Sequence, residues 1–401
     1  MASAPAAQRP DPVLERRPDP FALSDEERGV RDTVREFAQR ELAPTVAQRD
    51  EEERFDRSLF VRMGELGLTG LPYPEAYGGA GMSTFAWILA CEEIAAADMG
   101  MAVSLSVHIL CQLPILTFGS EEQRARFLPP MTAGTALGAF ALTEPGAGSD
   151  AAALALRADR TDGGYALSGT KIWITNGDEA DAYLVFATVD RARGRDGITA
   201  FVVERDTAGF RVGSHERKMG IRDSISAELI FDGALVPEEN RLGTEGEGLK
   251  VALSSLGAGR ISIAAACVGL ARAALEHAGR YALQRRQFGR PIADQEMIQA
   301  LLADAATRIE AARLLTWRAA RMRDAGQPIN AASSMAKLFA SDTAMQVTTD
   351  AVQVYGGAGY SRDNPVERFM RDAKGAQIYE GTNQIHRLIV AQHLLDELRR
   401  A

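Results

Sequence analysis

The segment Ile-Tyr-Glu-Gly-Thr at residues 378–382 contains a candidate general base, because Glu380 lies in a short loop directly before the last predicted helix. A positioned carboxylate can take a proton from a weak carbon acid when burial raises its pKa toward neutrality. Most carboxylates in such loops are solvated acids at a helix start. Other segments of the chain must therefore decide whether Glu380 belongs to a site.

Two glycine-rich segments have a backbone that a ligand could approach closely. The first, Ala-Leu-Thr-Glu-Pro-Gly-Ala-Gly-Ser-Asp at residues 141–150, offers free N–H groups and the Ser149 hydroxyl to phosphate oxygens or a ring edge. The second, Gln-Val-Tyr-Gly-Gly-Ala-Gly-Tyr at residues 353–360, interrupts a helical pattern and follows no strand, unlike a dinucleotide-binding glycine motif. Taken singly, the first segment is more readily explained as a structural turn, and the second is weak evidence because it also fits a plain helix stop.

Two further segments combine aromatic and polar side chains. In Lys-Ile-Trp-Ile-Thr-Asn-Gly at residues 171–177, Trp173 and Thr175 fall on one face of a predicted strand and could form a flavin wall with a hydrogen-bond donor. In Arg-Arg-Gln-Phe-Gly-Arg-Pro-Ile at residues 285–292, cations beside Phe288 suit a dinucleotide pyrophosphate and adenine. The alternatives are a surface strand ending in an Asn-Gly turn, and cations that complement a helix dipole.

The composition argues against several classes of protein. The chain has 401 residues and a net charge of −9 at pH 7, which disfavours nucleic-acid binding. Its cysteines, Cys91, Cys111 and Cys267, form no Cys-x-x-Cys pair and indicate buried thiols in a reducing compartment, and the histidines have no metal-ligand spacing. No apolar run is expected to approach the roughly 18 residues that span a membrane. Residues 1–20 predict a disordered tail, not a signal peptide.

The residue pattern predicts an α+β protein of three domains. Helical periodicity marks an N-terminal helical domain at residues 21–138, in which Ser24 caps an acid-rich helix start. Short β-branched or aromatic runs between turn signals mark a middle β domain, a barrel or sandwich, at residues 139–248. A C-terminal four-helix bundle is predicted at residues 249–401. Its helices are expected near residues 249–285, 293–325, 329–355 and 384–400.

In their order and spacing, the five segments resemble the acyl-CoA dehydrogenase family, and the resemblance covers residues 22–398. It implies an FAD-dependent enzyme of the short- or medium-chain type, with FAD between the last two domains and a homotetramer built as a dimer of dimers. It implies Glu380 as the catalytic base and substrate contacts at Ser149, Arg260 and Gly381. The implied FAD contacts are Phe140, Leu142, Thr143, Ser149, Trp173, Ile174, Thr175, Arg285, Gln287, Phe288, Gln353, Gly356, Gly357, Thr382 and Gln384. Those from Arg285 to Gly357 would come from the neighbouring subunit.

The resemblance also implies a reaction. Glu380 would take the α-proton of an acyl-CoA thioester, while its own N–H and a flavin ribityl hydroxyl hold the thioester oxygen, where negative charge develops. The β-hydrogen would leave as hydride to flavin N5, giving a trans-2-enoyl-CoA, and an electron-transfer flavoprotein would accept the electrons. The chain departs from the family pattern in two places. At Gly257, many members have an acid that contacts the CoA adenine. At residues 294–296 the chain reads Asp-Gln-Glu, ending in Glu296, whereas the family usually has an aromatic residue or His and then Gln.

Residues 83–115 would supply most of the acyl pocket. No Lys or Arg occurs between Arg62 and Arg124, which favours an uncharged acyl chain, either short to medium and straight or short and branched. His108 is expected to be a packing residue. The residues expected to line either this pocket or the ordinary core are Met99, Met101, Val103, Leu105 and Val107.

Other functions fit this chain less well. An acyl-CoA oxidase would usually be much longer, and a flavin monooxygenase or nitroalkane oxidase would lack Glu in the Tyr-Glu-Gly-Thr context. A non-catalytic acyl-CoA- or flavin-binding protein is the alternative from another class, and the retention of Glu380 argues against it. No nucleic-acid partner is expected. A bacterial cytoplasmic location is expected, with the mitochondrial matrix as the alternative.

Overall fold

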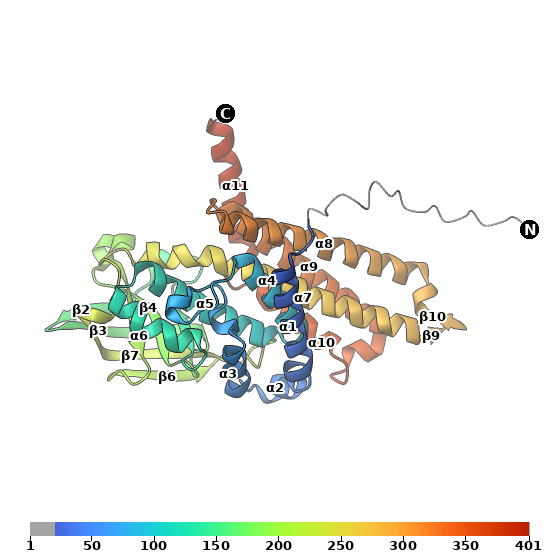
Figure 1. The fold of residues 1–401 in the computed structure, drawn as a ribbon, viewed down its shortest axis with the longest axis horizontal. Helices are drawn as coiled ribbons and strands as arrows, with labels where there is room; N and C mark the ends of the chain where they lie inside the picture. Colours follow the sequence, from blue (N-terminus) through green and yellow to red (C-terminus); the bar gives the residue numbers. More distant parts are fainter. Residues whose placement is uncertain (1–20, 401) are drawn as a thin grey trace, which may run out of the picture.

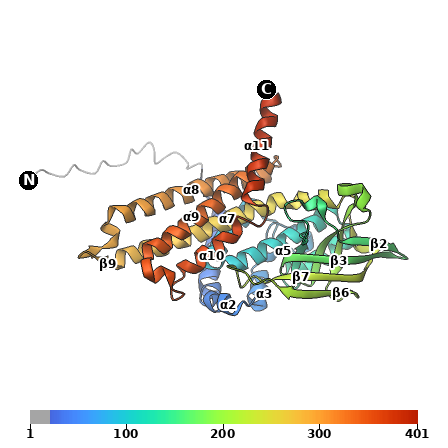
Figure 2. The same ribbon diagram turned by 180° about the vertical axis from the view of Figure 1, so that it is seen from behind.

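The computed structural model describes residues 21–400, so the tail expected at residues 1–20 lies outside the described residues. Long helices occupy one end of an elongated molecule and a β-sheet the other, with the N-terminal helices along one side (Figure 1). Seen from behind, α5 runs between the helical end and the sheet (Figure 2). The predicted order of helical, β and helical domains is confirmed.

The first helix of the N-terminal domain is capped by Ser24, as predicted. The Ser24 hydroxyl accepts from the Glu27 N–H at 3.2 Å and the Glu27 carboxylate accepts from the Ser24 N–H at 2.8 Å, which is a capping box. Ser83 caps α4, and the extended residue Asp98 ends α4 and caps α5, so a single residue separates the two helices. The helices of this domain are α1 (Asp25–Phe37), α2 (Val46–Glu52), α3 (Arg57–Glu65), α4 (Thr84–Ala97), α5 (Met99–Phe118) and α6 (Glu121–Thr132).

Two helices correct the expectation about long apolar runs. By length and composition, α5 and the first C-terminal helix, α7 (Gly248–Gln284), could each cross a membrane. The 20 residues of α5 include no Asp, Glu, Lys or Arg. Most of the apolar window is buried inside the protein, however, 72% in α5 and 78% in α7. Both are therefore core helices, which hydropathy alone does not separate from spanning segments.

The middle domain is one curled sheet. Within the described residues its strand order is β6-β7-β3-β2-β4-β5-β8, with β1 beside β4. Tyr165 on β3 and Phe201 on β5 have ring centroids 4.8 Å apart. In a flat sheet these strands would be about 14 Å apart, so the sheet must fold over its own core. The strands are β1 (Gly138–Ala141), β2 (Arg157–Thr161), β3 (Gly164–Thr175), β4 (Ala182–Thr188), β5 (Ile198–Glu204), β6 (Phe210–His215), β7 (Ser226–Pro237) and β8 (Arg241–Leu242).

Strand β4 joins the sheet to the N-terminal helices, because it is buried on both faces. Tyr183 and Val185 belong to the core that the sheet encloses, whereas Leu184 and Phe186 belong to a second core that includes Ile115 of α5. This explains why β4 is continuously apolar instead of alternating.

The C-terminal domain is built around α7, which packs against α4, α5, α8 and α9. The four predicted long helices are present, and the structure adds the shorter α10, which the sequence pattern did not reveal. The first part of α11 lies on α9 and its last turns project from the body (Figure 1). The remaining elements are the hairpin β9 (Arg286–Gln287) and β10 (Arg290–Pro291), α8 (Glu296–Asp324), α9 (Asn330–Tyr355), α10 (Val366–Ala376) and α11 (Asn383–Arg400).

Candidate active site

Glu380 lies in the turn between α10 and α11, in a backbone conformation that side chains rarely adopt. Its φ is 55° and that of Gly381 is 89°, so two consecutive residues are left-handed. For a residue other than glycine this conformation is strained and persists only where the surroundings hold it. His386 Nε2 donates to the Glu380 carbonyl at 3.1 Å, and Lys337 Nζ donates to the Gly381 carbonyl at 2.7 Å. We call residues 377–382 the catalytic turn.

The Glu380 carboxylate lies against α7. A Cβ on Gly259 would be only 2.9 Å from Glu380 Oε2 and 3.0 Å from Oε1, so the helix can pass here because residue 259 has no side chain. The residue as a whole is half-buried, but Oε2 itself is inaccessible and has no hydrogen-bond partner. Within residues 21–400 the carboxylate forms no ion pair. A buried acceptor without a donor is rare in proteins and marks a position of interest.

Burial raises the pKa of Glu380 to about 7, and the positive charges of Arg260 and Lys337 act in the opposite direction. Arg260 is itself buried, and its Nη1 donates to Asn330 Oδ1 at 2.7 Å. A carboxylate with a pKa near neutrality is suited to general-base chemistry.

Trp173 lies at a bulge of β3. The pairing of β3 with β7 shifts between Lys171 and Ile174, and Trp173 has a φ of 59°. The residue is 54% exposed, an unusual condition for one with so large an apolar side chain. Thr175 is half-buried, whereas the Ile174 side chain lies in the sheet core, so only its backbone can face a ligand.

A buried ion pair fixes the loop of residues 141–150 to β3. Lys171 Nζ lies 2.6 Å from Glu144 Oε1 and donates to the Leu142 carbonyl at 3.0 Å, while the Glu144 carboxylate also accepts from the Leu156 N–H. The Ile172 N–H donates to the Thr143 carbonyl at 3.0 Å, directly before Trp173. Leu142 and Thr143 are half-buried beside this strand. Phe140 is also half-buried, and Ser149 is exposed at the loop's end.

The loop of residues 216–225 connects the end of β3 to α10, the helix that precedes the catalytic turn. The Asn176 N–H donates to the Ile225 carbonyl at 2.9 Å, and the Ile221 N–H donates to the Asp372 carboxylate on α10. Arg49, which is 0% exposed, joins the same loop to α5 by ion pairs to Asp223 at 2.7 Å and to Asp98 at 2.6 Å. This loop therefore joins the sheet to the helices through hydrogen bonds and buried ion pairs.

The other expected FAD contacts lie at the far end of the helices. Tyr281 and Tyr355 stack with centroids 4.0 Å apart, which brings the ends of α7 and α9 together. Arg285, Gln287, Gln353, Gly356 and Gly357 are exposed there, and Phe288 is 94% exposed at the tip of the β9–β10 hairpin. This end of α7 is roughly 39 Å from Gly259 along the helix axis. Thr382 and Gln384, in contrast, lie in or next to the catalytic turn.

The structure also shows where the two departures from the family pattern, Gly257 and Glu296, lie. A Cβ on Gly257 would be 3.0 Å from Ile329 Cδ1, so α7 meets the α8–α9 connection closely at this position. Glu296 is the exposed first residue of α8. His108 is a packing residue, as expected: its ring accepts from the Gly138 N–H and donates to the Met131 carbonyl, and burial lowers its pKa to about 4.

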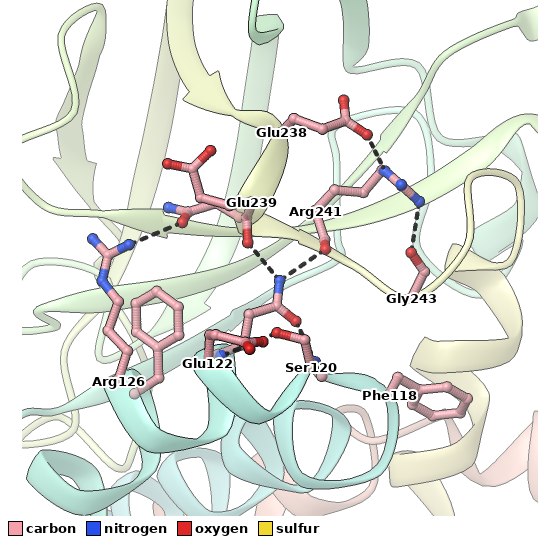
Figure 3. A pocket seen from close by; sticks show the side chains of 12 residues that line it. Phe118, Ser120, Glu122, Arg126, Glu238, Glu239, Arg241 and Gly243 are labelled. Carbon is pink, nitrogen blue, oxygen red and sulfur yellow. Dashed lines mark hydrogen bonds and ion pairs between the residues drawn. The ribbon is translucent and has the colours of Figure 1, made fainter.

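A cavity of about 560 Å³ lies elsewhere, between α6 and the turn that links β7 to β8 (Figure 3). Gln123 donates to the carbonyls of Glu239 and Arg241, and Arg241 is bound to Glu238 (Figure 3). None of the expected site residues lines this cavity. Its polar groups largely bind one another, so its size alone does not indicate chemistry. Within residues 21–400, no three His, Cys, Asp or Glu side chains are grouped to hold a metal ion.

Three family models match the chain in order: the acyl-CoA dehydrogenase N-terminal domain at residues 24–135, the middle domain at 139–234 and the C-terminal domain at 246–395. The chain belongs to the acyl-CoA dehydrogenase family. It is therefore an FAD-dependent oxidoreductase, as expected from the five segments.

Relatives and solved structures match over nearly the whole chain. An acyl-CoA dehydrogenase of Bacillus subtilis is 50% identical over 374 residues, covering 93% of this chain and 99% of the relative. A short-chain specific acyl-CoA dehydrogenase of Megasphaera elsdenii is 46% identical, covering 94% and 99%. The structure of butyryl-CoA dehydrogenase from Megasphaera elsdenii matches with a TM-score of 0.92, 46% identity and coverages of 94% and 99%. A chain from work on the electron transferring flavoprotein of Acidaminococcus fermentans matches with a TM-score of 0.93, 49% identity and coverages of 94% and 99%.

Several residues of this acyl-CoA dehydrogenase were not found from the sequence. Glu144, Lys171, Gly259, Lys337 and His386 each position an expected site residue. Glu144 and Lys171 stand inside two of the singled-out motifs, so their opposite charges were the one available signal. The other three lie on helices whose local pattern shows only that they are helical.

Proposed function

We propose that the protein dehydrogenates a short acyl-CoA thioester to its trans-2-enoyl-CoA and that Glu380 takes the α-proton. Acyl-CoA dehydrogenation itself follows from the family. The assignment of the base rests on one observation, the buried Glu380 Oε2 without a donor, together with a pKa raised to about 7. Such a carboxylate is ionised in a large fraction of molecules near neutral pH and is not held by another group.

The catalytic turn also supports a site for the thioester oxygen. Within the described residues the Glu380 N–H donates to no protein acceptor, whereas the N–H groups of Ile378 and Tyr379, earlier in the turn, both donate to the Gly375 carbonyl. In the proposed complex this N–H donates to the thioester carbonyl, where negative charge develops as the proton leaves. Gly381 lets the substrate approach the backbone here, and Ser149 contacts the CoA portion. Bound FAD supplies the acceptor for the β-hydride.

The exposed aromatic residues fit a flavin cofactor. Trp173, 54% exposed at its bulge, offers an apolar plane, and Thr175 offers a hydroxyl on the same side of β3. We assign Phe140, Leu142 and Thr143 to the same flavin wall, together with the Ile174 backbone and with Thr382 and Gln384 from the opposite side. These residues would hold the ring and exclude water.

The residues at the far end of α7 and α9 fit a cofactor bound by another subunit. Phe288 is 94% exposed, and one chain cannot place both this end and Glu380 on the same flavin portion. We therefore propose that Arg285, Gln287 and Phe288 contact the adenosine diphosphate half in a neighbouring subunit, as do Gln353, Gly356 and Gly357. The exposed leucines of α11, including Leu394 and Leu398, fit the same assembly, a homotetramer built as a dimer of dimers.

A short acyl chain is supported by the contact between α5 and α7. Ser262 donates to the Gly259 carbonyl at 2.9 Å, and its hydroxyl lies 2.5 Å from that of Ser106 on α5. Ser262 is three residues after Gly259, the glycine against which the Glu380 carboxylate lies. This corresponds to a rise of about 4.5 Å along α7. An acyl chain following this contact would meet the pair after a few methylene groups. Four of the five expected pocket residues, Met99, Met101, Val103 and Leu105, are buried, and Val107 is half-buried.

The chain-length proposal is tested with Ser106→Gly, which should raise the rate with hexanoyl-CoA relative to butyryl-CoA. Ser104→Gly is the matched control, because it removes a hydroxyl on the same helix that pairs with Ser224 instead, at 2.8 Å. An unchanged chain-length profile in Ser106→Gly, or an equal change in both variants, would contradict the proposal.

An electron-transfer flavoprotein is the proposed electron acceptor. The similarity to a chain from work on the electron transferring flavoprotein of Acidaminococcus fermentans supports this choice. Bacterial relatives are consistent with the cytoplasmic location expected, whereas a relative from Rattus norvegicus, 46% identical, is mitochondrial.

The proposed function is tested by anaerobic reduction of the bound flavin. The purified protein should be yellow, and butyryl-CoA should bleach it, followed by absorbance, whereas an electron-transfer flavoprotein should restore the colour. A flavin that stays oxidised across a panel of acyl-CoA thioesters would exclude dehydrogenation by this protein as isolated.

A further inference from the structure

Lys337 on α9 is a buried lysine whose hydrogen-bond acceptors are both neutral. Its side chain is 0% exposed, and Nζ donates to the Gly381 carbonyl at 2.7 Å and to Asn383 Oδ1 at 3.1 Å. A buried ammonium normally pairs with a carboxylate. Lys171, also 0% exposed, does so with Glu144 at 2.6 Å. The environment of Lys337 therefore needs a different explanation from simple charge pairing.

The surrounding polar groups fix the direction of the Asn383 amide. Asn383 Nδ2 donates to Ser341 Oγ at 2.9 Å and to Asp342 Oδ1 at 2.7 Å, which leaves its Oδ1 facing the ammonium. Asp342 also accepts from Gln377 Nε2 at 2.7 Å. Because Gln377 is the first residue of the catalytic turn and Asn383 directly follows it, α9 binds both ends of the turn, and Lys337 binds the Gly381 carbonyl within it.

The position of Lys337 next to Glu380 has two consequences. The carbonyl that Lys337 binds belongs to the residue directly after the base, in the left-handed part of the turn. Yet Lys337 forms no ion pair with Glu380 within the described residues, and Oε2 has no partner. A direct ion pair would depress the pKa of the carboxyl strongly and weaken it as a base. A cation that does not contact the carboxylate stabilises its negative charge through the electric field and leaves Glu380 Oε2 free to accept a proton.

We propose that Lys337 is a positioning residue for the catalytic base: its ammonium anchors the Gly381 carbonyl, which keeps Glu380 in its left-handed conformation, and its charge favours the ionised carboxylate without touching it. The proposal rests on the assignment of Glu380 as the base. The titratable groups around Lys337 are Cys267 and Arg260 on α7, Asp342 on α9, Glu380 in the catalytic turn and His386 on α11. Among these, Arg260 is the other cation acting on Glu380, so Lys337 is expected to supply part of the field.

Three substitutions separate charge from hydrogen bonding. Lys337→Gln keeps a donor for the Gly381 carbonyl and removes the charge, Lys337→Arg keeps both, and Lys337→Met removes both. Lys250→Gln is the matched control, because Lys250 is an exposed lysine on α7 that binds Glu247 Oε1 at 2.9 Å, outside the catalytic turn. FAD content is measured for every variant. Because Gln and Arg preserve a donor, the test does not depend on the folding of Lys337→Met.

The first measurement is the infrared carbonyl band of the protonated Glu380 carboxyl in the holoenzyme, identified by its loss in Glu380→Gln and followed against pH. Removing a nearby positive charge raises the pKa of a carboxyl. In Lys337→Gln we therefore expect the midpoint to rise by about one pH unit, the lower end of the effect of a nearby charge. Lys337→Arg and Lys250→Gln should keep the wild-type midpoint. A wild-type midpoint in Lys337→Gln would overturn the electrostatic role.

The second measurement is the rate of flavin reduction by butyryl-CoA against pH. The acidic limb of Lys337→Gln should shift upward by the same unit, with a loss of about fivefold at pH 7 that is recovered at higher pH. Lys337→Met should show the shift and also a lower plateau, because its turn lacks the anchor. A wild-type plateau in Lys337→Met would overturn the anchoring role. If no acyl-CoA reduces the wild-type flavin, the proposed function fails, and the infrared titration still tests Lys337.

Discussion

Gly259 on α7 provides a direct test of the proposed base, because the missing side chain makes room for the Glu380 carboxylate. In Gly259→Ala the new Cβ would lie 2.9 Å from Glu380 Oε2, whereas ordinary van der Waals contact begins at 3.4 Å. The carboxylate is the free end of a side chain, so it moves more easily than the helix. A misplacement of ~1 Å at a reacting group costs ~100-fold, so a retreat of about 0.5 Å should slow flavin reduction about tenfold.

The same substitution should not weaken the fold. Alanine is favoured over glycine inside a helix by roughly 0.5–1 kcal/mol. We therefore expect the free energy of unfolding of Gly259→Ala to equal or exceed that of the wild type, although activity falls. Gly279→Ala is the matched control: it lies on the same helix, and its new Cβ would meet nothing within 4 Å. It should gain the helical stabilisation and keep full activity.

The assay for both variants is single-turnover reduction of the bound flavin by butyryl-CoA without oxygen, with FAD content and thermal unfolding measured on the same samples. A Gly259→Ala variant that reduces its flavin at the wild-type rate would show that the carboxylate position seen here is not the reactive one. A parallel loss of activity in Gly279→Ala would show that the effect comes from the helix and not from Glu380.

Three other perturbations have definite expected outcomes. Glu380→Gln should keep FAD and ligand binding and lose flavin reduction by at least ~100-fold; in the wild type the rate should rise with pH through about 7, where Glu380 ionises, and a rate independent of pH there would contradict the assignment. Arg49→Met leaves Asp98 and Asp223 buried without their cation and should lower the free energy of unfolding by about 3–5 kcal/mol, measured by denaturant titration. Phe288→Ala should weaken FAD retention during dialysis without unfolding the protein, because its ring is 94% exposed in the monomer.

The sequence predicted features that are local in the chain. Ser24 caps the first helix as predicted, and Trp173 is exposed directly before Ile174, which lies in the sheet core. These features depend on residues a few positions apart, where side-chain alternation and capping rules are reliable. The bulge at Trp173 was not predicted, because an extra residue in one strand is defined only against its partner, β7.

Buried charges were the main features that the sequence did not reveal. Arg49, Lys171 and Lys337 are each 0% exposed, although charged residues in helices and strands are normally expected on the surface. Their burial depends on partners from distant segments: Asp98 and Asp223 for Arg49, for example. Composition and periodicity do not encode such pairings, and the family resemblance transfers only the residues of its motifs.

The arrangement around Glu380 resolves a conflict between burial and charge. Burial alone would favour the neutral carboxylic acid, which cannot take a proton, whereas a direct ion pair would favour a carboxylate too weakly basic for a thioester Cα–H. The fold avoids both extremes, because Arg260 is bound to Asn330 and Lys337 to the Gly381 carbonyl, and neither cation is paired with Glu380. Both cations lower a pKa that burial raises, and the balance is near 7. The neutral partners of these two cations are therefore as necessary to the proposed base as the cations themselves.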